Sequence, residues 1–155
     1  MKTRELQTLW WDWLGTSERL LRSLHEQTAA VTLRDVARVE RIQPELDVLL
    51  ERVKAIDESA AACAKKLAEE LGTESNLRSL ASVLEKAEAQ QLQGLANRVL
   101  VAARNLQEVF TKNRTLIENE LTYVIGSLTL IARAGSDNGR FGSKGRTAVL
   151  VDQAA

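Results

Sequence analysis

A stripe of mostly apolar residues, repeating every three or four positions, runs through the C-terminal half of the chain and constrains its fold more than any other feature. It extends over about fifty residues at the period of an α-helix that buries one face. So long a helix needs neighbouring helices to cover it, which predicts an all-α, coiled-coil-like bundle. The stripe consists of Leu84, Ala87, Gln91, Leu95, Val99, Ala102, Leu106, Val109, Asn113, Leu116, Ile117, Leu121, Val124, Leu128 and Ile131.

A shorter stripe near the N-terminus predicts a first helix that ends at about Thr28. Gly15 begins a Gly-Thr-Ser sequence in the middle of this stripe, so we expect a break there. The pattern resumes in phase beyond the glycine, which indicates that both parts share one buried face. That face consists of Leu6, Trp10, Trp13, Leu20 and Leu24.

A third stripe predicts a middle helix of about forty residues. Thr32 and Asp35 form a Thr-x-x-Asp signal that predicts its start. Pro44 lacks a backbone N–H, so we expect a kink or a restart near this residue. Gly72 is suited to end the helix. The apolar face consists of Val36, Val39, Leu46, Leu49, Leu50, Val53, Ile56, Ala60, Cys63, Leu67 and Leu71.

Two further start signals separate the middle stripe from the last one. Asn76 is placed to cap a short turn that carries Leu77 and Leu80. Residues 82–85 read Ser-Val-Leu-Glu, a capping-box pattern, so the last long helix is predicted to begin there. It is predicted to end near Gly135, where the glycines begin.

The predicted fold is therefore an elongated antiparallel bundle of three long helices. Residues 1–134 form the helical bundle domain, and residues 135–155 form a flexible Gly-rich tail with an apolar end. Helices of about 25, 40 and 50 residues cannot cover one another fully, because the last exceeds the first by tens of ångströms. An uncovered apolar stripe usually marks a surface for a partner.

Composition excludes several classes of partner and location. Basic and acidic residues balance at 21 each, so no net charge attracts nucleic acid. No apolar stretch approaches the ~20 residues of a membrane span, and the N-terminus lacks the apolar core of a signal peptide. Cys63 is the only cysteine, which indicates a reducing compartment. We therefore expect a cytoplasmic protein with no nucleic-acid partner and no membrane insertion.

Signals for catalysis or for a cofactor are weak. His25 is the only histidine, and its position beside Glu26 on a helix favours an ordinary surface residue. Cys63 lies among alanines, which favours a small core residue over a nucleophile. A histidine–cysteine set for zinc is missing. The adjacent acidic residues at 57–58 and 69–70 point about 100° apart on a helix, which favours solvated faces. We predict no enzyme, no metal and no cofactor.

The glycine-rich end admits three interpretations: a disordered remnant, a phosphate-binding loop, or a segment that meets a partner. A P-loop requires Gly-x-x-x-x-Gly-Lys-Ser/Thr between a strand and a helix. Residues 142–145 read Gly-Ser-Lys-Gly, with neither the required pair nor a preceding strand. This excludes nucleotide binding and leaves the other two interpretations open.

Aromatic residues give a second set of candidates. Trp10 and Trp13 share one helix face and are expected in the core, whereas Trp11 points elsewhere and is expected at the surface. Exposed tryptophan is enriched at protein contacts. Tyr123 is the only tyrosine, and its position near the end of the last helix suits a residue at the edge of the core and a docking residue equally well.

Three features together resemble the FlgN-type flagellar export chaperones. They are an all-helical chain of this length, a long terminal helix containing NRTLIENELTYVIGSLTLI, and an ending of Phe141-x-x-x-Gly145-Arg146. Members of that family often finish with Tyr-x-x-x-Gly, so phenylalanine replaces the usual tyrosine here. The segment RVERIQPELDVLLERVKAI also resembles the Leu-rich second helix of the family.

The resemblance implies a cytoplasmic, non-enzymatic chaperone of type III flagellar secretion. Such a protein binds the C-terminal helical segments of FlgK-like and FlgL-like hook–filament junction proteins, prevents premature assembly, and delivers them to an FlhA-like export gate. A junction protein's apolar helix would pack against the far end of the last helix, and the tail would close over it. The expected partner-binding residues are Leu116, Ile117, Leu121, Tyr123, Val124, Leu128, Ile131, Phe141, Val149, Leu150 and Val151.

A different interpretation also accounts for the uncovered stripe. The chain could be a structural coiled-coil or adaptor protein that self-associates through its last helix and has no role in secretion. The sequence leaves a homodimer open. Sedimentation would separate the two interpretations, because the second requires a tight dimer that depends on the stripe of the last helix.

Overall fold

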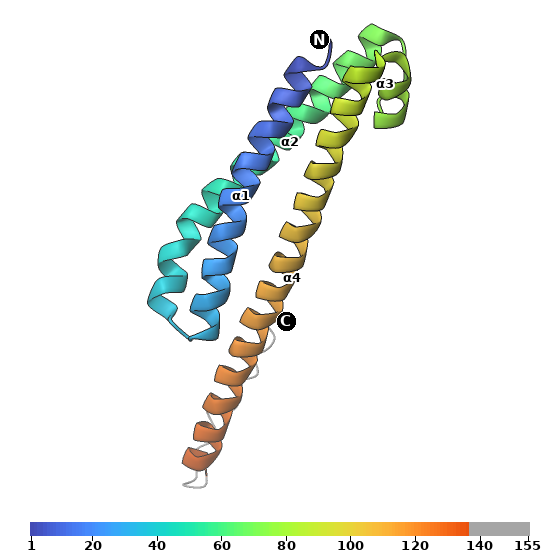
Figure 1. Cartoon of the computed structure of the whole chain (residues 1–155). Coiled ribbons are helices and arrows are strands. Elements are labelled where there is room, and N and C mark those ends of the chain that lie inside the picture. The colour runs from blue at the N-terminus through green and yellow to red at the C-terminus, as the bar shows by residue number, and fades with distance from the viewer. Residues whose placement is uncertain (137–155) are drawn as a thin grey trace.

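The structure is a computed structural model that describes the backbone of residues 1–136 and the side chains of residues 1–119. Within that part of the chain the fold is all-helical, as predicted. Two helices form an antiparallel hairpin, and a long helix runs beside the first of them and continues past the hairpin (Figure 1). The helices are α1 (Arg4–Thr32), α2 (Val36–Leu71), α3 (Leu77–Val83) and α4 (Lys86–Ser136). A short fourth helix thus joins the three that were predicted.

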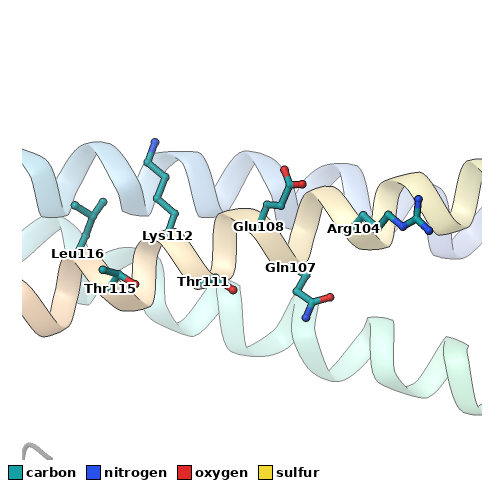
Figure 2. A pocket seen from close by; sticks show the side chains of 7 residues that line it. All are labelled: Arg104, Gln107, Glu108, Thr111, Lys112, Thr115 and Leu116. Atoms are coloured by element: carbon teal, nitrogen blue, oxygen red, sulfur yellow. The ribbon is translucent and has the colours of Figure 1, made fainter.

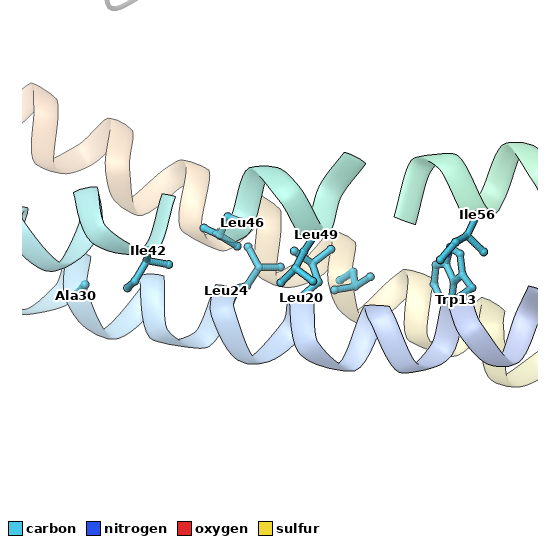
Figure 3. Packing of buried hydrophobic residues seen from close by; sticks show 9 residues of the cluster. Trp13, Leu20, Leu24, Ala30, Ile42, Leu46, Leu49 and Ile56 are labelled. Carbon is cyan, nitrogen blue, oxygen red and sulfur yellow. The ribbon is translucent and has the colours of Figure 1, made fainter. Parts of the chain in front are cut away.

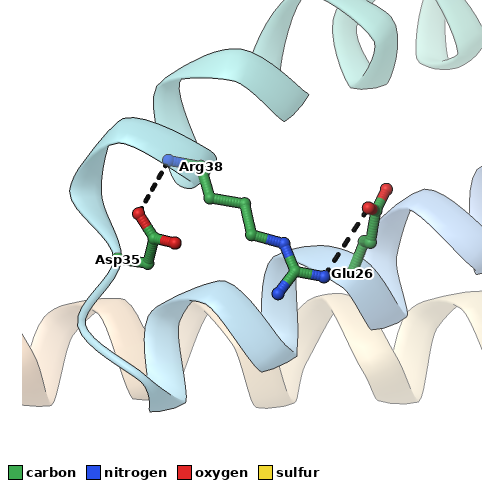
Figure 4. Close-up of polar contacts among 3 residues, drawn as sticks. All are labelled: Glu26, Asp35 and Arg38. Atoms are coloured by element: carbon green, nitrogen blue, oxygen red, sulfur yellow. Dashed lines mark hydrogen bonds and ion pairs between the residues drawn. The ribbon is translucent and has the colours of Figure 1, made fainter.

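The turn between α1 and α2 differs from the prediction. Thr32 does not start the second helix but ends the first, where its hydroxyl donates to the Thr28 carbonyl at 2.7 Å. Asp35 is the capping residue of α2, and its carboxylate accepts the Arg38 backbone N–H at 3.1 Å (Figure 4). The Arg38 guanidinium also lies 3.6 Å from the Glu26 carboxylate of α1. The predicted cap of α2 was three residues too early, because α1 continues four residues beyond its predicted end.

Neither Gly15 nor Pro44 interrupts its helix. Gly15 is exposed within a continuous α1, so the expected break is absent. Pro44 lies inside a continuous α2, so of the predicted kink or restart the restart is absent. Proline withholds one donor from the carbonyl of residue 40. Pro44 and Glu40 are both exposed, and water can satisfy that carbonyl there.

The end of α2 and the whole of α3 follow local signals. Gly72 adopts the left-handed conformation with φ 65°, and the Thr73 N–H donates to the Ala68 carbonyl at 3.0 Å, which confirms the predicted helix end. Asn76 caps α3 as predicted by accepting the Ser79 N–H at 2.7 Å. The capping box at residues 82–85 was wrong, because Ser82 belongs to the last turn of α3 and α4 begins at Lys86.

The buried side chains form two clusters along the molecule. The larger one joins α1, α2 and α4 beside the hairpin (Figure 3) and consists of Trp13, Leu20, Leu24, Ala30, Ile42, Leu46, Leu49, Ile56 and Leu106. The smaller one lies at the α3 end and consists of Leu6, Ala60, Leu67, Ala68, Leu80 and Leu92. The predicted faces were wrong at Val36, Ala87 and Gln91, which are exposed.

Candidate functional site

Helix α4 runs parallel to α1 in a constant register. Thr3, just before α1, contacts Glu88, and Thr28 near its end contacts Asn113; both pairs are separated by 85 residues in the sequence. Two contacts at the same offset place the helices side by side and in the same direction. This register decides where α1 stops covering α4.

The first contact holds the start of α1 against α4. The Thr3 backbone N–H and hydroxyl both donate to Glu88 Oε1, at 2.8 and 2.7 Å. The backbone hydrogen bond from Thr3 is the main cause that lowers the pKa of Glu88 below its ordinary value. Only 9% of Glu88 and none of Thr3 is exposed. Glu88 is therefore buried and held by Thr3, although acidic residues on a helix are usually exposed to solvent.

The second contact is a buried amide near the end of the hairpin. Asn113 is 2% exposed, and its Nδ2 donates to the Leu24 carbonyl at 2.8 Å and to Gln27 Oε1 at 2.9 Å. The Thr28 hydroxyl donates to Asn113 Oδ1. A buried asparagine in an apolar stripe favours the one register in which its partners face it. The hydrogen bonds of Asn113 with Leu24, Gln27 and Thr28 thus hold α4 at one position along α1.

Beyond Asn113 the long helix leaves its neighbour. At the same 85-residue offset Thr32, the last residue of α1, is level with Ile117. Helix α4 continues to Ser136 past the turn between α1 and α2, as Figure 1 shows. We call residues 118–136 the α4 extension; it is about 19 residues, or about 28 Å, long. The described helices α1, α2 and α3 do not reach beside it.

The predicted partner-binding residues divide at this point. Leu116 is half-buried and Ile117 is 40% exposed, so both lie where the cover ends. Five others lie on the helical backbone of the α4 extension, and their side chains are outside the described set: Leu121, Tyr123, Val124, Leu128 and Ile131. The four predicted in the tail lie outside the described residues altogether: Phe141, Val149, Leu150 and Val151.

Helical spacing groups the residues on the extension. Ile117, Leu121, Val124, Leu128 and Ile131 recur at steps of three or four, which continues the face of α4 that carries Leu106 and Asn113 against α1. Residues one position apart on a helix differ by about 100° in direction, which sets position 123 to one side of that face.

An open hollow lies on α4 just before the extension (Figure 2). Its lining side chains come from successive turns of that helix: Arg104, Gln107, Glu108, Thr111, Lys112, Thr115 and Leu116. All but Leu116 are exposed polar or charged groups. The carbon atoms of these side chains form most of the exposed surface of the hollow, and so open a surface suits a protein contact better than a small ligand.

Two exposed apolar sites escaped the sequence analysis. Leu33 and Val36, in the turn between α1 and α2, are 71% and 67% exposed. The stripe of α2 had placed Val36 in the core, because nothing in the local pattern shows that α2 starts there at the surface. Leu100 and Val101 on α4 are the second site, at 49% and 55% exposed.

The tryptophan predictions are confirmed for Trp13 and Trp11, whereas Trp10 is only partly buried and packs against the smaller cluster. Trp13 is buried, and Trp11 is 53% exposed. The Arg98 guanidinium lies 5.5 Å from the centroid of the Trp11 ring, so α4 supports this side chain by a cation–π contact. Shallow hollows flank the pair between α1 and α4.

The described residues show little that could carry out catalysis. His25 is exposed, and so are the acidic pairs at 57–58 and 69–70. Burial raises the pKa of the Cys63 thiol, which disfavours the reactive thiolate. The described part of the chain contains no group of three histidine, cysteine or acidic residues placed to hold a metal. None of its helices is long and apolar enough to cross a membrane.

Comparison with known protein families matches residues 1–148 to the family described as FlgN protein. No curated protein and no solved structure matches the chain. The family match covers all four helices, including the whole of the α4 extension.

Proposed function

The chain belongs to the FlgN family, whose members are flagellar export chaperones, and on that premise we propose the client, the binding surface and the route of delivery. The clients are FlgK-like and FlgL-like hook–filament junction proteins, which the protein holds by their C-terminal helical segments in the cytoplasm. It prevents their premature assembly and passes them to an FlhA-like component of the export gate.

The α4 extension is the observation that carries this proposal. Its helix lies beyond the reach of α1, and apolar residues continue along it at helical spacing. An amphipathic client helix can pack against that face as α1 packs against the earlier turns, a helix-in-groove mode of recognition. This packing also buries the apolar stripe of the client helix, which in the assembled flagellum contacts neighbouring subunits.

The contacts of Glu88 with Thr3 and of Asn113 with Gln27 and Thr28 oppose a shift of α4 that would bring its extension beside α1. A shift by one or two turns along α1 would separate Glu88 from Thr3 and Asn113 from Gln27. Each buried group left without a partner costs about 1–3 kcal/mol. The register that satisfies these groups also leaves the last part of α4 available to another chain.

The tail and Tyr123 have separate roles in the proposal. Phe141 and the apolar residues 149–151 close over a bound client, and ordering this segment costs about 1–2 kcal/mol per residue. That cost keeps the affinity moderate, so that release at the gate is feasible. Tyr123 contacts the gate component, because its helical position lies to one side of the client-binding stripe.

Calorimetry with C-terminal peptides of the FlgK-like and FlgL-like proteins tests the proposal. We expect the intact chain to bind at least one peptide, and a variant lacking residues 135–155 to bind it more weakly with an unchanged melting temperature. Equal affinity of the two chains would contradict the role of the tail. Tyr123→Ala is expected to impair capture of the gate component more than capture of the client, and equal loss of both in pull-downs would contradict the assignment.

The alternative occupant of the extension is a second copy of the chain. Sedimentation of the intact chain tests it directly, because self-association through the extension predicts a tight dimer. A dimer that dissociates on substitution of the stripe and binds neither peptide would replace the chaperone proposal.

A further inference from the structure

The turn that joins α1 to α2 presents two apolar side chains to solvent. We call residues 33–36 the hairpin end; Leu33 is 71% exposed and Val36 is 67% exposed. Both values exceed the exposure of every other described large apolar residue except Met1, which is also 71% exposed. Both side chains lie in the turn at one end of the hairpin, three residues apart, and expose apolar surface there.

The hairpin end is level with the start of the α4 extension. At the 85-residue offset that relates α1 to α4, Leu33 is level with Glu118, one residue past Ile117. Packed helices lie about 8–10 Å apart, so the end of α1 stands about one helix diameter from the extension. The exposed Ile117, at 40%, faces the same level of the molecule.

A layer of mutually hydrogen-bonded polar side chains separates the hairpin end from the apolar core. Asn113, Gln27 and Thr28 satisfy one another across the α1–α4 interface, and no described buried side-chain nitrogen or oxygen lacks a partner. A client helix that separated α1 from α4 would have to break this layer. It therefore packs beyond the layer, in line with α1 and not in its place.

We propose that the hairpin end is the second part of the client-binding surface: one terminus of the client helix abuts Leu33 and Val36 while its apolar face covers the α4 extension. The inference rests on the proposed function and adds the position of the client. Continuity with the α1–α4 interface supports a helix as the occupant, since the same face of α4 already carries α1. The extension accommodates a helical segment of about five turns.

Paired substitutions at matched exposure test the inference. Leu33→Gln/Val36→Gln removes both apolar groups, and Val48→Gln is the control, because Val48 lies within α2 and is 66% exposed. Calorimetry uses synthetic C-terminal peptides of the FlgK-like and FlgL-like proteins. We expect the double variant to bind about tenfold more weakly, as for loss of about 1.4 kcal/mol, and the control to bind like the unmodified chain. Both variants are expected to melt normally, since these side chains are exposed.

Photocrosslinking supplies the position. A benzophenone maleimide on Leu33→Cys, in a Cys63→Ala background, is expected to label one terminus of the bound peptide, whereas the same probe on Val48→Cys labels none of it. Equal affinity of the double variant and the unmodified chain, or labels spread along the whole peptide, would overturn the inference alone. Failure of the unmodified chain to bind either peptide would overturn the proposed function and the inference with it.

Discussion

The first and last parts of α4 carry the same apolar period but differ in what covers it. From Lys86 to Asn113 the helix packs against α1, and polar contacts at both ends of this stretch fix the register. From residue 118 to Ser136 the described helices do not reach it. The comparison teaches that hydrophobic period alone predicts a helix with a buried face and does not say which molecule buries it.

Leucine-to-alanine substitution at one site in each part separates them by the largest expected effect. Leu92 is fully buried, so Leu92→Ala should lower the free energy of unfolding by about 2–5 kcal/mol. Leu128→Ala, the matched change in the extension, should lower it by less than about 1 kcal/mol and weaken peptide binding instead. Chemical denaturation measures the first quantity, and calorimetry measures the second. A comparable loss of stability in both variants would mean that the extension is covered in the free chain.

The buried amide that ends the covered part gives the next largest effect. Asn113→Ala leaves the Gln27 side chain and the Leu24 carbonyl without their partner, so we expect a loss of about 1–3 kcal/mol in the free energy of unfolding. Asn119→Ala, an exposed site on the same helix, is the control and should change it by less than about 0.5 kcal/mol. Equal denaturation midpoints for the two variants would show that the amide does not hold the register.

The carboxylate at the other end of the covered part adds a pH dependence. Glu88→Gln should lower the free energy of unfolding by about 1–2 kcal/mol at pH 7, because the charged acceptor of the Thr3 hydrogen bonds is lost. The folded-state pKa of Glu88 lies below its unfolded value, so its contribution is present above the ordinary pKa of glutamate, about 4.3, and is lost as the pH falls through the lower, folded value.

Denaturation of both chains between pH 7 and pH 3 checks this sign. The difference between the unmodified chain and Glu88→Gln should be constant at neutral pH and should narrow in acid. A difference that widens as the pH falls would contradict the assignment of the charged form to this contact.

The smallest expected effect concerns the exposed tryptophan. Trp11→Ala removes the contact with the Arg98 guanidinium and should cost about 0.5–1 kcal/mol. Trp13→Ala, two positions on but buried, should cost about 3–5 kcal/mol. Thermal melting of the two variants measures the contrast. Similar losses would show that Trp11 is packed as firmly as Trp13.

Local signals allowed parts of the fold to be predicted. The Gly72 and Asn76 caps involve atoms within five residues of each other, so their sequence context contains all the information needed. The start signals at Thr32 and Ser82 failed for a different reason. Both residues belong to the preceding helix, and the length of that helix depends on packing against other segments.

Long-range contacts could not be predicted in this way. The predicted stripe does not include Glu88, whose partner Thr3 lies 85 residues away in the sequence. The stripe consequently included Ala87 and Gln91 and omitted the buried Leu92. The unequal helix lengths did predict that α4 would extend beyond the neighbouring helices. The apolar hairpin end was missed, because the exposure of Leu33 and Val36 depends on where two helices meet.

Hydrogen–deuterium exchange with and without a C-terminal peptide of a FlgK-like or FlgL-like protein tests most directly whether the uncovered part of α4 is the client site. Backbone amides of residues 118–136 should gain protection on binding, by at least about tenfold, while those of residues 86–113 stay as slow as in the free chain. Protection gained only outside the extension, or no change despite binding, would contradict the assignment of the client to this segment.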